Sequence, residues 1–464
     1  MFVDGMKSVV LVTCSALLYA AAFMVPELAW GVVVSLALIA LFFMQGRVGE
    51  EGVSRRSFFL YGLWWGLVTY LLLLTPLIKV FHSFFSLPMT YFLWCAAGML
   101  LALYAGVWFL LMTWVCKVDC YPVFILLFSY IFFMVMNEAS LWFFGVVEGC
   151  LFFSPVVPLV AYKSMLFLLS IIGHRLALLC LLGVTVGIVY VYGRYTFRVF
   201  LMVCLMCGGV IGLFSVFQER VVQEIVDPPF ISSVAWSSVP FDPIGTIPAW
   251  RTTHDVYNVL RCASCDKEVR LVIFPESTCA WCLNDTSQMT YCVQQALTDS
   301  PGLTCIVGSH RREGDDVYAS LYVFTGNECR SSYDKQHRVF FVERLPWLLE
   351  KVGWAGNLCQ SCPFKQARSK RVLISCAGMS FVPLMCSDLF FACTAPDLVN
   401  VMPDTCVLCC INDAWFEGTF FPDLLYKTAV MQAVSWRRIL VYVSHSRGRC
   451  LMRDGRQINL KRVV

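Results

Sequence analysis

The feature that most constrains this chain is an almost continuous apolar stretch over residues 8–217. Residues 218–464, in contrast, read as an ordinary mixed globular sequence. Hydrophobic residues make up 59% of the chain and charged residues 14%, and the mean hydropathy is +0.70, which is more apolar surface than a water-soluble globular protein can expose. The sequence therefore predicts a transmembrane domain over residues 1–217 and a second, globular domain over residues 218–464.

The length of the apolar runs predicts how often the first part crosses a membrane. A bilayer core of ~30 Å needs ~20 apolar residues for each helical crossing. Seven runs fit that length, near residues 8–25, 28–45, 57–78, 90–115, 121–142, 174–192 and 197–217. Residues 143–173 are also apolar but are interrupted by glycine and proline, so we expect a re-entrant or interface-lying segment, with an eighth span as the alternative.

The loops between these spans differ in positive charge. If the N-terminus is inside, the cytoplasmic loops hold seven Lys and Arg residues and the outer loops hold three. Positive residues collect on the cytoplasmic side of membrane proteins, which favours this orientation. Seven spans then place the second domain on the outer face of the membrane, which in a bacterial cell is the periplasm.

The second domain shows both strand and helix patterns. Short apolar and β-branched runs typical of strands occur at residues 269–275, 304–309, 317–324, 371–376, 380–385, 405–411 and 438–444. Helical periodicity occurs at residues 250–262 and 424–436, and Asp454-Gly455 is typical of a hairpin turn. Strands mixed with amphipathic helices predict a layered α/β sandwich, so we expect an α+β membrane protein.

Cysteine is unusually frequent, with 24 residues in the chain and sixteen of them after residue 217. Four pairs have CxxC spacing: Cys262/Cys265, Cys279/Cys282, Cys359/Cys362 and Cys406/Cys409. Such pairs can form zinc sites, but these are scattered among predicted strands and few histidines accompany them. We expect disulfides in an oxidising compartment, or free thiols, and no metal at the functional site.

Three predicted strands each end in a residue of a different reactive type. Glu276 follows a strand in "VIFPES", Lys335 lies in "YDKQH", and Cys386 follows a strand in "SFVPLMCSD". A thiol needs a base to remove its proton, and an ammonium can stabilise the negative charge that forms on a carbonyl oxygen under attack. Catalytic residues gather where strands of α/β sheets end, so we expect these three to meet.

Four segments carry a family resemblance: "FPES", "YDKQHRVFFVE", "PLMCSD" and "INDAWF". Their order and approximate spacing resemble those of the Glu-Lys-Cys enzymes of the nitrilase superfamily. With a multi-span membrane half before it, the chain resembles the apolipoprotein N-acyltransferase family. The resemblance implies a polytopic helical bundle followed by a nitrilase-like αββα sandwich, a catalytic triad of Glu276, Lys335 and Cys386, and no cofactor.

The resemblance also implies further site residues. Glu343 and Asp388 would support the triad, and four residues would contact substrate: Glu138, Trp250, Asn412 and Trp415. Glu138 lies inside a predicted span, where an ionisable residue is costly and is kept for function or for a structural pair. Trp250 of "PAWR" is similar to a residue of the family's access loop. Residues 343–357 could form an amphipathic lid at the bilayer surface, or a helix packed on the domain.

The reaction implied by the resemblance has two lipid partners. A membrane glycerophospholipid would give its acyl chain to Cys386, and the α-amino group of a diacylglyceryl-cysteine at the N-terminus of an apolipoprotein would take it. The family works at the bacterial inner membrane, and we expect a monomer that binds no nucleic acid. The alternatives are a membrane-bound amidase of the same superfamily and a non-catalytic scaffold that presents lipoproteins.

The sequence departs from the family at three points. Ser387 stands where an aromatic residue is usual, and Asp388 stands where the family has a glutamate. The family usually has a further C-terminal span, so we expect that span to be absent or the chain to be truncated after "INLKRVV". His337 and His445 could suggest a Cys-His pair, but the sequence shows no partner that would orient either ring.

Overall fold

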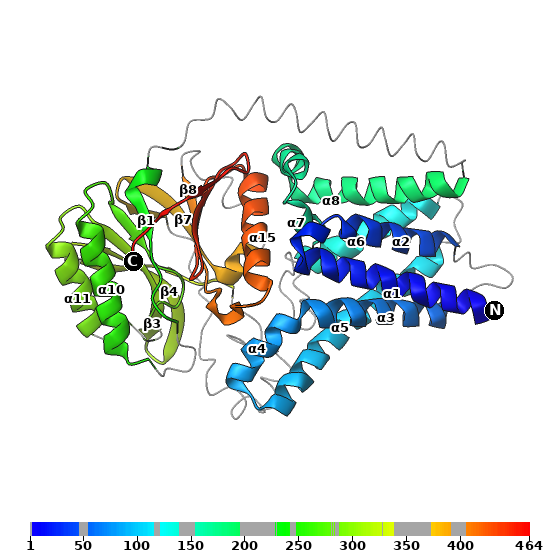
Figure 1. The fold of residues 1–464 in the computed structure, drawn as a ribbon, viewed down its shortest axis with the longest axis horizontal. Coiled ribbons are helices and arrows are strands. Elements are labelled where there is room, and N and C mark those ends of the chain that lie inside the picture. The colour runs from blue at the N-terminus through cyan, green and yellow to red at the C-terminus, as the bar shows by residue number, and fades with distance from the viewer. Residues whose placement is uncertain are drawn as a thin grey trace. The chain divides into compact units, whose positions relative to one another are not determined.

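The computed structural model describes most of the chain in two compact units (Figure 1). The described segments are residues 2–45, 54–115, 121–138, 154–194, 230–241, 247–279, 287–326, 328–337, 373–390 and 405–464, with single residues between some of them. One unit contains Met1–Asn137, Phe152–Gln223 and Gly418–Lys427, and the other contains Glu138–Leu151, Glu224–Glu417 and Thr428–Val464. The predicted boundary after residue 217 lies outside the described residues.

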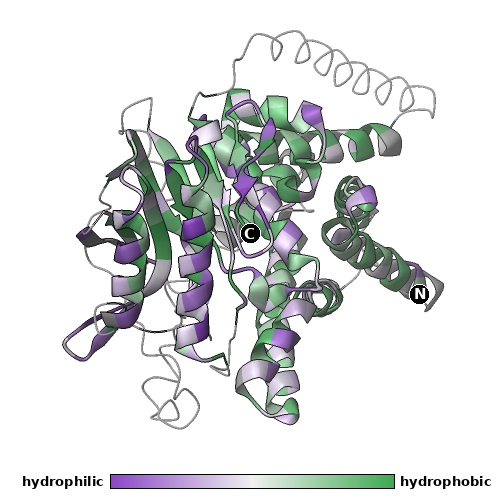
Figure 2. Ribbon diagram, turned by 60° about the vertical axis from the view of Figure 1, so that its left-hand side comes forward, coloured by the Kyte–Doolittle hydropathy of each residue, from purple (hydrophilic) through white to green (hydrophobic). Residues whose placement is uncertain are grey.

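The first unit consists of apolar helices. Along the chain these are α1 (Phe2–Met24), η1 (Pro26–Leu28), α2 (Gly31–Gln45), α3 (Arg55–Leu73), α4 (Thr75–Phe84), α5 (Leu87–Val115), α6 (Tyr121–Glu138), α7 (Val156–Leu159) and α8 (Lys163–Arg194). Figure 2 shows most of their length as hydrophobic, and large apolar side chains such as Phe92, Trp114 and Met6 are exposed. Helices that are apolar on all sides are typical of membrane spans.

Among the described residues, three helices are long and apolar enough to cross a membrane: Met6–Met24, Leu87–Trp114 and Lys163–Val191. A fourth candidate is the pair Arg55–Leu73 and Thr75–Ser83, which is bent by 55°. The segments Gly31–Met44 and Phe124–Phe133 are apolar but shorter. The chain is therefore a membrane protein, although fewer helices meet this test than the seven predicted spans; the predicted span at residues 197–217 lies outside the described part.

Two breaks interrupt helices that the hydropathy pattern does not resolve. The predicted span at residues 57–78 ends at Leu73, because Pro76 in the first turn of α4 has no N–H to continue the helix. In α8, Gly173 has a φ of 71°, so residues 163–172 and 174–194 are two helical pieces. The second piece begins where a span was predicted. The predicted re-entrant segment includes α7, but residues 139–153 lie outside the described part.

Helices α3 and α5 pack closely through two glycines in the sequence "GLWWG". A Cβ atom at Gly62 would lie 2.7 Å from the Ala105 carbonyl oxygen, and one at Gly66 would lie 2.6 Å from Ala102 Cα. Small residues four apart let helix backbones approach each other in a membrane, where packing rather than the hydrophobic effect drives association. This spacing therefore fixes the contact between α3 and α5.

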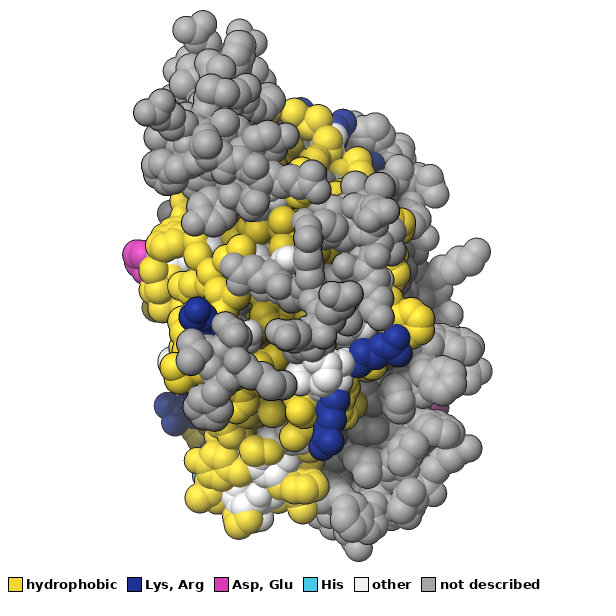
Figure 3. All heavy atoms as spheres, turned by 90° about the vertical axis from the view of Figure 1, so that its right-hand side faces the viewer, with side chains coloured by type: hydrophobic (Ala, Val, Ile, Leu, Met, Phe, Trp, Pro, Cys, Tyr) yellow, Lys and Arg dark blue, Asp and Glu magenta, His cyan; other side chains and the backbone are white. Residues whose placement is uncertain are grey.

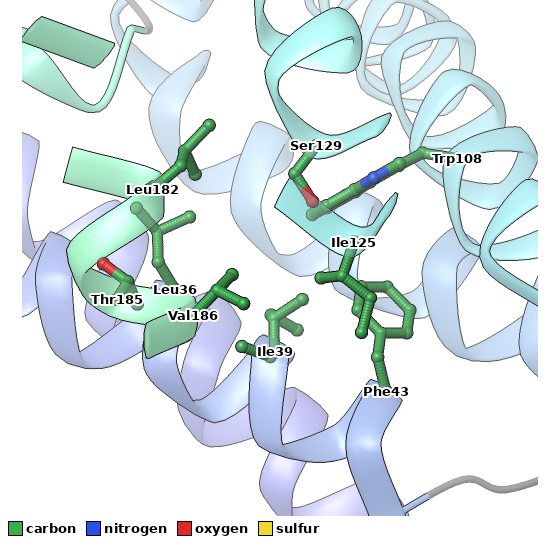
Figure 4. A pocket seen from close by; sticks show the side chains of 10 residues that line it. Leu36, Ile39, Phe43, Trp108, Ile125, Ser129, Leu182, Thr185 and Val186 are labelled. Carbon is green, nitrogen blue, oxygen red and sulfur yellow. The ribbon is translucent and has the colours of Figure 1, made fainter. Parts of the chain in front are cut away.

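A small pocket lies inside the helical unit between α2, α5, α6 and α8 (Figure 4). Its lining is apolar except for Ser129, Thr185 and the indole of Trp108. Figure 3 shows one face of the molecule, where the described side chains are mainly hydrophobic with scattered Lys and Arg. Apolar side chains thus line the pocket inside the helical unit and also cover the surface seen in Figure 3, as is typical of a membrane-spanning unit.

The second unit is a sandwich of two six-stranded sheets. The first sheet has the order β12-β1-β2-β3-β4-β5, and the second has the order β11-β10-β9-β8-β7-β6. The first contains β1 (Val234–Trp236), β2 (Leu271–Ile273), β3 (Thr304–Glu313), β4 (Asp316–Thr325), β5 (Glu328–Asp334) and β12 (Lys461–Arg462). The second contains β6 (Ile374–Cys376), β7 (Met379–Met385), β8 (Cys406–Cys410), β9 (Leu440–Val443), β10 (Gly448–Leu451) and β11 (Gln457–Asn459).

The sandwich has two described hydrophobic clusters. One joins the facing sides of the two sheets and includes Ile273, Leu321, Phe381 and Leu408. The other packs α10 (Ala249–Ser264) and α11 (Ser287–Thr298) against the outer face of the first sheet. Residues 428–436 of α15 (Phe421–Trp436) also belong to this unit, and Figure 1 shows α15 next to the second sheet. The predicted fold class, apolar helices followed by an α/β sandwich, is confirmed.

The predicted elements of this unit are present, and six further elements were missed. All seven predicted strands and both predicted helices have counterparts, and Asp454-Gly455 lies in the turn between β10 and β11. The missed elements are β1, β5, β10, β11, β12 and α11. Short η turns occur at Ile231–Ser233, Cys386–Phe390 and Ala414–Phe416.

Candidate active site

The two sheets each supply residues to one cluster of polar side chains. Glu276 lies three residues after β2, and Lys335 directly follows β5, so both belong to the first sheet. Cys386 directly follows β7, and Asn412 lies two residues after β8, so both belong to the second sheet. Because the sheets pack face to face, residues at these strand ends can meet across the sandwich.

Glu276 and Lys335 form a buried ion pair. Their side chains are 4% and 2% exposed, and Lys335 Nζ donates to Glu276 Oε1 over 2.8 Å. Two charges are stable in such surroundings only if they are paired and hydrogen-bonded. Glu276 Oε2 accepts a further hydrogen bond from the backbone N–H of Asn412 at 3.2 Å. The carboxylate therefore bridges the first sheet and the end of β8.

Cys386 lies at the same end of the sandwich. β7 and β8 are parallel, with Met385 opposite Cys410, so Cys386 and Asn412 follow neighbouring strand ends. Burial raises the pKa of the Cys409 thiol, and nearby Cys410, Cys386, Asp388 and Glu276 raise it further by charge repulsion. Both Cys386 and Glu276 are thus close enough to Cys409 to affect its ionisation.

Backbone strain marks two positions of this cluster. Cys386 has a φ of 41° and Ser277, directly after Glu276, has a φ of 56°, which are left-handed conformations that residues with a side chain rarely adopt. Such conformations persist only where the surrounding structure holds them, and they collect at functional sites. The Cys386 thiol is half-buried.

Asp388 connects the loop that carries Lys335 to the turn that carries Cys386. Asp388 is fully buried. Its Oδ1 accepts a hydrogen bond from the backbone N–H of His337 at 2.9 Å and also lies 2.8 Å from His337 Nδ1. Its Oδ2 accepts from the Tyr333 hydroxyl at 2.6 Å and from the Met385 N–H at 3.0 Å. Burial alone would raise the pKa of Asp388, but these bonds and the charge of His337 lower it, so the carboxylate is ionised at neutral pH.

Ser387 and His337 also take part in the contact between these two loops. The Ser387 hydroxyl donates to the His337 carbonyl oxygen, which adds a further link between the two loops. The expectation that His337 lacks an orienting partner is wrong, because Asp388 binds its Nδ1. Tyr333, Lys335 and His337 are spaced two apart in "YDKQH", and in extended backbone that spacing places side chains on one side. This spacing is the sequence signal that could have indicated the link.

The Glu276 loop packs tightly against β3. A Cβ atom at Gly308 would lie 2.4 Å from the Pro275 carbonyl oxygen and 2.6 Å from Glu276 Cα. Only glycine fits there without moving the loop. On another side, His445 Nε2 lies 3.3 Å from the Glu276 carbonyl oxygen, and burial lowers the pKa of His445. Sequence patterns had indicated neither contact.

Two of the predicted substrate-contacting residues lie next to this cluster. Asn412 is buried, and within the described part of the chain neither its Oδ1 nor its Nδ2 has a hydrogen-bond partner. Trp415 is partly buried, and its ring lies 5.0 Å from that of Phe241, which also contacts His445 at 5.4 Å. These aromatic rings form one wall beside the Glu276 loop.

The remaining predicted site residues are Trp250, Glu138 and Glu343. Trp250 lies in the first turn of α10 rather than in a loop, and 60% of it is exposed. Glu138 is the last residue of α6. Glu343 and the predicted lid at residues 343–357 lie outside the described residues, so they stay predictions.

The cysteines of two CxxC pairs are free thiols. Cys262 and Cys265 at the end of α10 are exposed, whereas Cys406 and Cys409 are buried. The latter two belong to one extended strand, where residues three apart point to opposite faces and are too distant for a disulfide. The described residues include no group of His, Cys, Asp and Glu that could hold a metal ion.

Comparison with known proteins gives one sequence match and several weak structural ones. No family model matches the chain. An apolipoprotein N-acyltransferase from Sinorhizobium fredii (strain NBRC 101917 / NGR234) is 26% identical over 178 residues, which cover 36% of this chain and 33% of that protein. The chain thus matches about a third of the length of this relative.

Among solved structures, a mutant of an amidase of the nitrilase superfamily from Nesterenkonia AN1 is 14% identical with a TM-score of 0.36, covering 49% of this chain and 86% of that one. A CN-hydrolase superfamily protein from Xanthomonas campestris is 14% identical with a TM-score of 0.35, covering 49% and 84%. The resemblance predicted from the four sequence segments is confirmed by the curated relative: over part of its length, this chain is similar to an apolipoprotein N-acyltransferase.

Proposed function

We propose that this protein is a membrane-bound acyltransferase that moves a fatty acyl chain from a glycerophospholipid to the α-amino group of the diacylglyceryl-cysteine at the N-terminus of an apolipoprotein. Glu276, Lys335 and Cys386 are its catalytic residues. The proposal places the enzyme in a bacterial inner membrane, with the sandwich on the periplasmic side and the bilayer as the source of both substrates.

The observation that carries the proposal is the buried contact between Lys335 and Glu276 at 2.8 Å, at the same end of the sandwich as Cys386. A carboxylate held at the strand end next to the thiol can act as the base that takes the thiol proton. The same cation can stabilise an oxyanion that forms next to it. One buried pair thus supplies the two functions that a cysteine nucleophile needs.

In the first half of the reaction, Cys386 Sγ attacks the carbonyl carbon of a phospholipid ester while Glu276 takes the thiol proton. Lys335 stabilises the tetrahedral oxyanion, the C–O bond breaks, and Glu276 returns the proton to the departing lysophospholipid oxygen. The acyl chain is now a thioester on Cys386.

In the second half, the neutral α-amino group attacks the thioester. A C–N bond forms, the C–S bond breaks, and Glu276 carries the proton from the amine to the departing sulfur. Covalent storage of the acyl chain lets two bulky lipids use the site in turn rather than together.

The test is the acyl-enzyme itself. Purified protein is mixed with dipalmitoyl phosphatidylethanolamine and no acceptor, and intact-mass spectrometry should show a palmitoyl adduct that neutral hydroxylamine removes. Cys386→Ala should abolish the adduct, whereas Cys292→Ala, which removes another half-buried thiol, should retain it. Absence of the adduct from the unaltered protein would contradict the proposal. Release of free fatty acid, with no transfer when a diacylglyceryl-cysteine peptide is added, would indicate a hydrolase instead.

A further inference from the structure

The side-chain amide of Asn412 has no role in holding the described structure together. Its residue is 3% exposed, and its backbone N–H, not its side chain, makes the bond to Glu276. Within the described residues, both Oδ1 and Nδ2 lack partners. Buried amides are nearly always hydrogen-bonded, because leaving them unpaired costs free energy. An amide left unpaired directly beside a candidate catalytic base is therefore available to a bound substrate.

The position of Asn412 indicates which substrate group it can serve. Lys335 occupies Oε1 of Glu276, and Asn412 lies at Oε2. The first substrate in the proposed function presents an ester, which has no N–H or O–H to donate. The second presents a primary amine, whose lone pair must face the thioester while its two N–H groups face hydrogen-bond acceptors. Glu276 can accept one of them. Asn412 Oδ1, which lacks a partner within the described residues and belongs to the residue whose backbone N–H binds Glu276, can accept the other.

We propose that Asn412 is the residue that recognises the primary amine of the acyl acceptor. Its Oδ1 accepts the N–H that Glu276 does not take, and its Nδ2 donates to a carbonyl oxygen of the same acceptor. This inference rests on the proposed function, since it concerns only the second half of that reaction. During transfer, the proton held by Glu276 goes to Cys386 sulfur, and the proton bound to Asn412 stays on the amide nitrogen of the product.

The inference predicts a selectivity that separates the two half-reactions. Dipalmitoyl phosphatidylethanolamine is used first to form the thioester, and excess donor is removed. A diacylglyceryl-cysteine peptide with a free α-amine is then compared, in single-turnover experiments, with the same peptide carrying an N-methyl group, which has only one N–H when neutral. The unaltered protein should transfer to the primary amine about 10- to 100-fold faster, the range expected when one hydrogen bond is lost.

Asn412→Leu keeps the size of the side chain and the backbone N–H that binds Glu276. It should still form the thioester, should transfer to the primary amine about 10- to 100-fold more slowly, and should treat the two peptides alike within about threefold. Asn258→Leu is the matched control: it replaces an exposed amide on α10 whose side chain bonds to His254, and it should keep the full selectivity.

Three results would overturn the inference. Equal slowing of thioester formation and transfer in Asn412→Leu would mean a general role in the site. Retained selectivity in that variant would mean that another group binds the amine. No selectivity in the unaltered protein would remove the basis for the idea. If the unaltered protein forms no thioester at all, the proposed function fails, and that result is distinct from the three above.

Discussion

Replacing Asp388 by asparagine should destabilise the sandwich far more than the loss of one exposed charge would. The substitution preserves shape but turns one carboxylate oxygen into an NH₂ group. Oδ1 faces two donors on His337, and Oδ2 faces the Tyr333 hydroxyl and the Met385 N–H. Whichever way the amide lies, its NH₂ faces two donors and two hydrogen bonds are lost.

The magnitude follows from the kind of bond that is removed. A hydrogen bond to a charged group contributes about 1.5–3 kcal/mol, and breaking a buried charge pair typically costs ~3–5 kcal/mol. Because Asp388 has no exposed surface, water cannot replace the lost partners. We expect Asp388→Asn to lower the free energy of unfolding of the sandwich by ~3–5 kcal/mol.

Buried cysteines make this measurable in detergent. Cys409, Cys410 and Cys450 have no exposed surface, so a short pulse of maleimide at increasing urea labels them only in unfolded sandwich. Asp315→Asn, an exposed carboxylate in the turn between β3 and β4, is the control and should shift the curve by less than ~0.5 kcal/mol. A shift for Asp388→Asn that is as small as that of the control would refute the role of Asp388 as a buried link between the two loops.

Three further outcomes are expected. Gly308→Ala should displace the Glu276 loop and slow thioester formation about 100-fold, because the new Cβ would meet backbone atoms. Gly187→Ala is the control and should leave the rate unchanged, because there is open space around Gly187. Equal rates in the two variants would contradict this prediction. Burial lowers the pKa of His310 to about 4, below its value in the unfolded chain. The free energy of unfolding should therefore fall by ~3 kcal/mol as the pH drops from ~6.5 toward 4. His310→Gln should remove that loss when the two proteins are compared by pulse labelling at about pH 7 and 4.5. Glu276→Gln should slow thioester formation by ~100-fold or more, since it removes the base; a smaller effect would assign the proton transfer to another group.

The sequence was most informative where a local pattern decides the structure. Apolar runs predicted where the long apolar helices lie but not the breaks after Leu73 and at Gly173, and apolar β-branched runs predicted seven of the strands. β5 has the sequence "ECRSSYD" and lacks such a pattern; it is a strand because β4 pairs with it. β12 contains two residues and exists only through its pairing with β1. Elements that depend on a partner far away in the chain could not be predicted from their own residues.

For the candidate site, too, single residues were easier to predict than their arrangement in space. Glu276 and Cys386 each follow an apolar run that forms a strand, whereas Lys335 follows β5, which has no such run, and was selected through the resemblance of "YDKQHRVFFVE" to a known family. Their mutual arrangement depends on the register of the sheets and on how the two sheets face each other. A slip of one residue in the pairing of β7 with β8 would turn every side chain of the strand to the other face. No local pattern contains that information.

Register also explains why Asp388 and Asn412 matter although they are not the reactive groups. With Met385 opposite Cys410, the ends of β7 and β8 lie side by side, and two backbone N–H groups there bond to carboxylates rather than to a neighbouring strand. The N–H of Met385 is taken by Asp388, and that of Asn412 is taken by Glu276. Each carboxylate thus closes the end of a strand and at the same time binds a residue of the first sheet. A charge that satisfies the backbone at a strand end is held in one orientation, which is the property a catalytic base or its support requires.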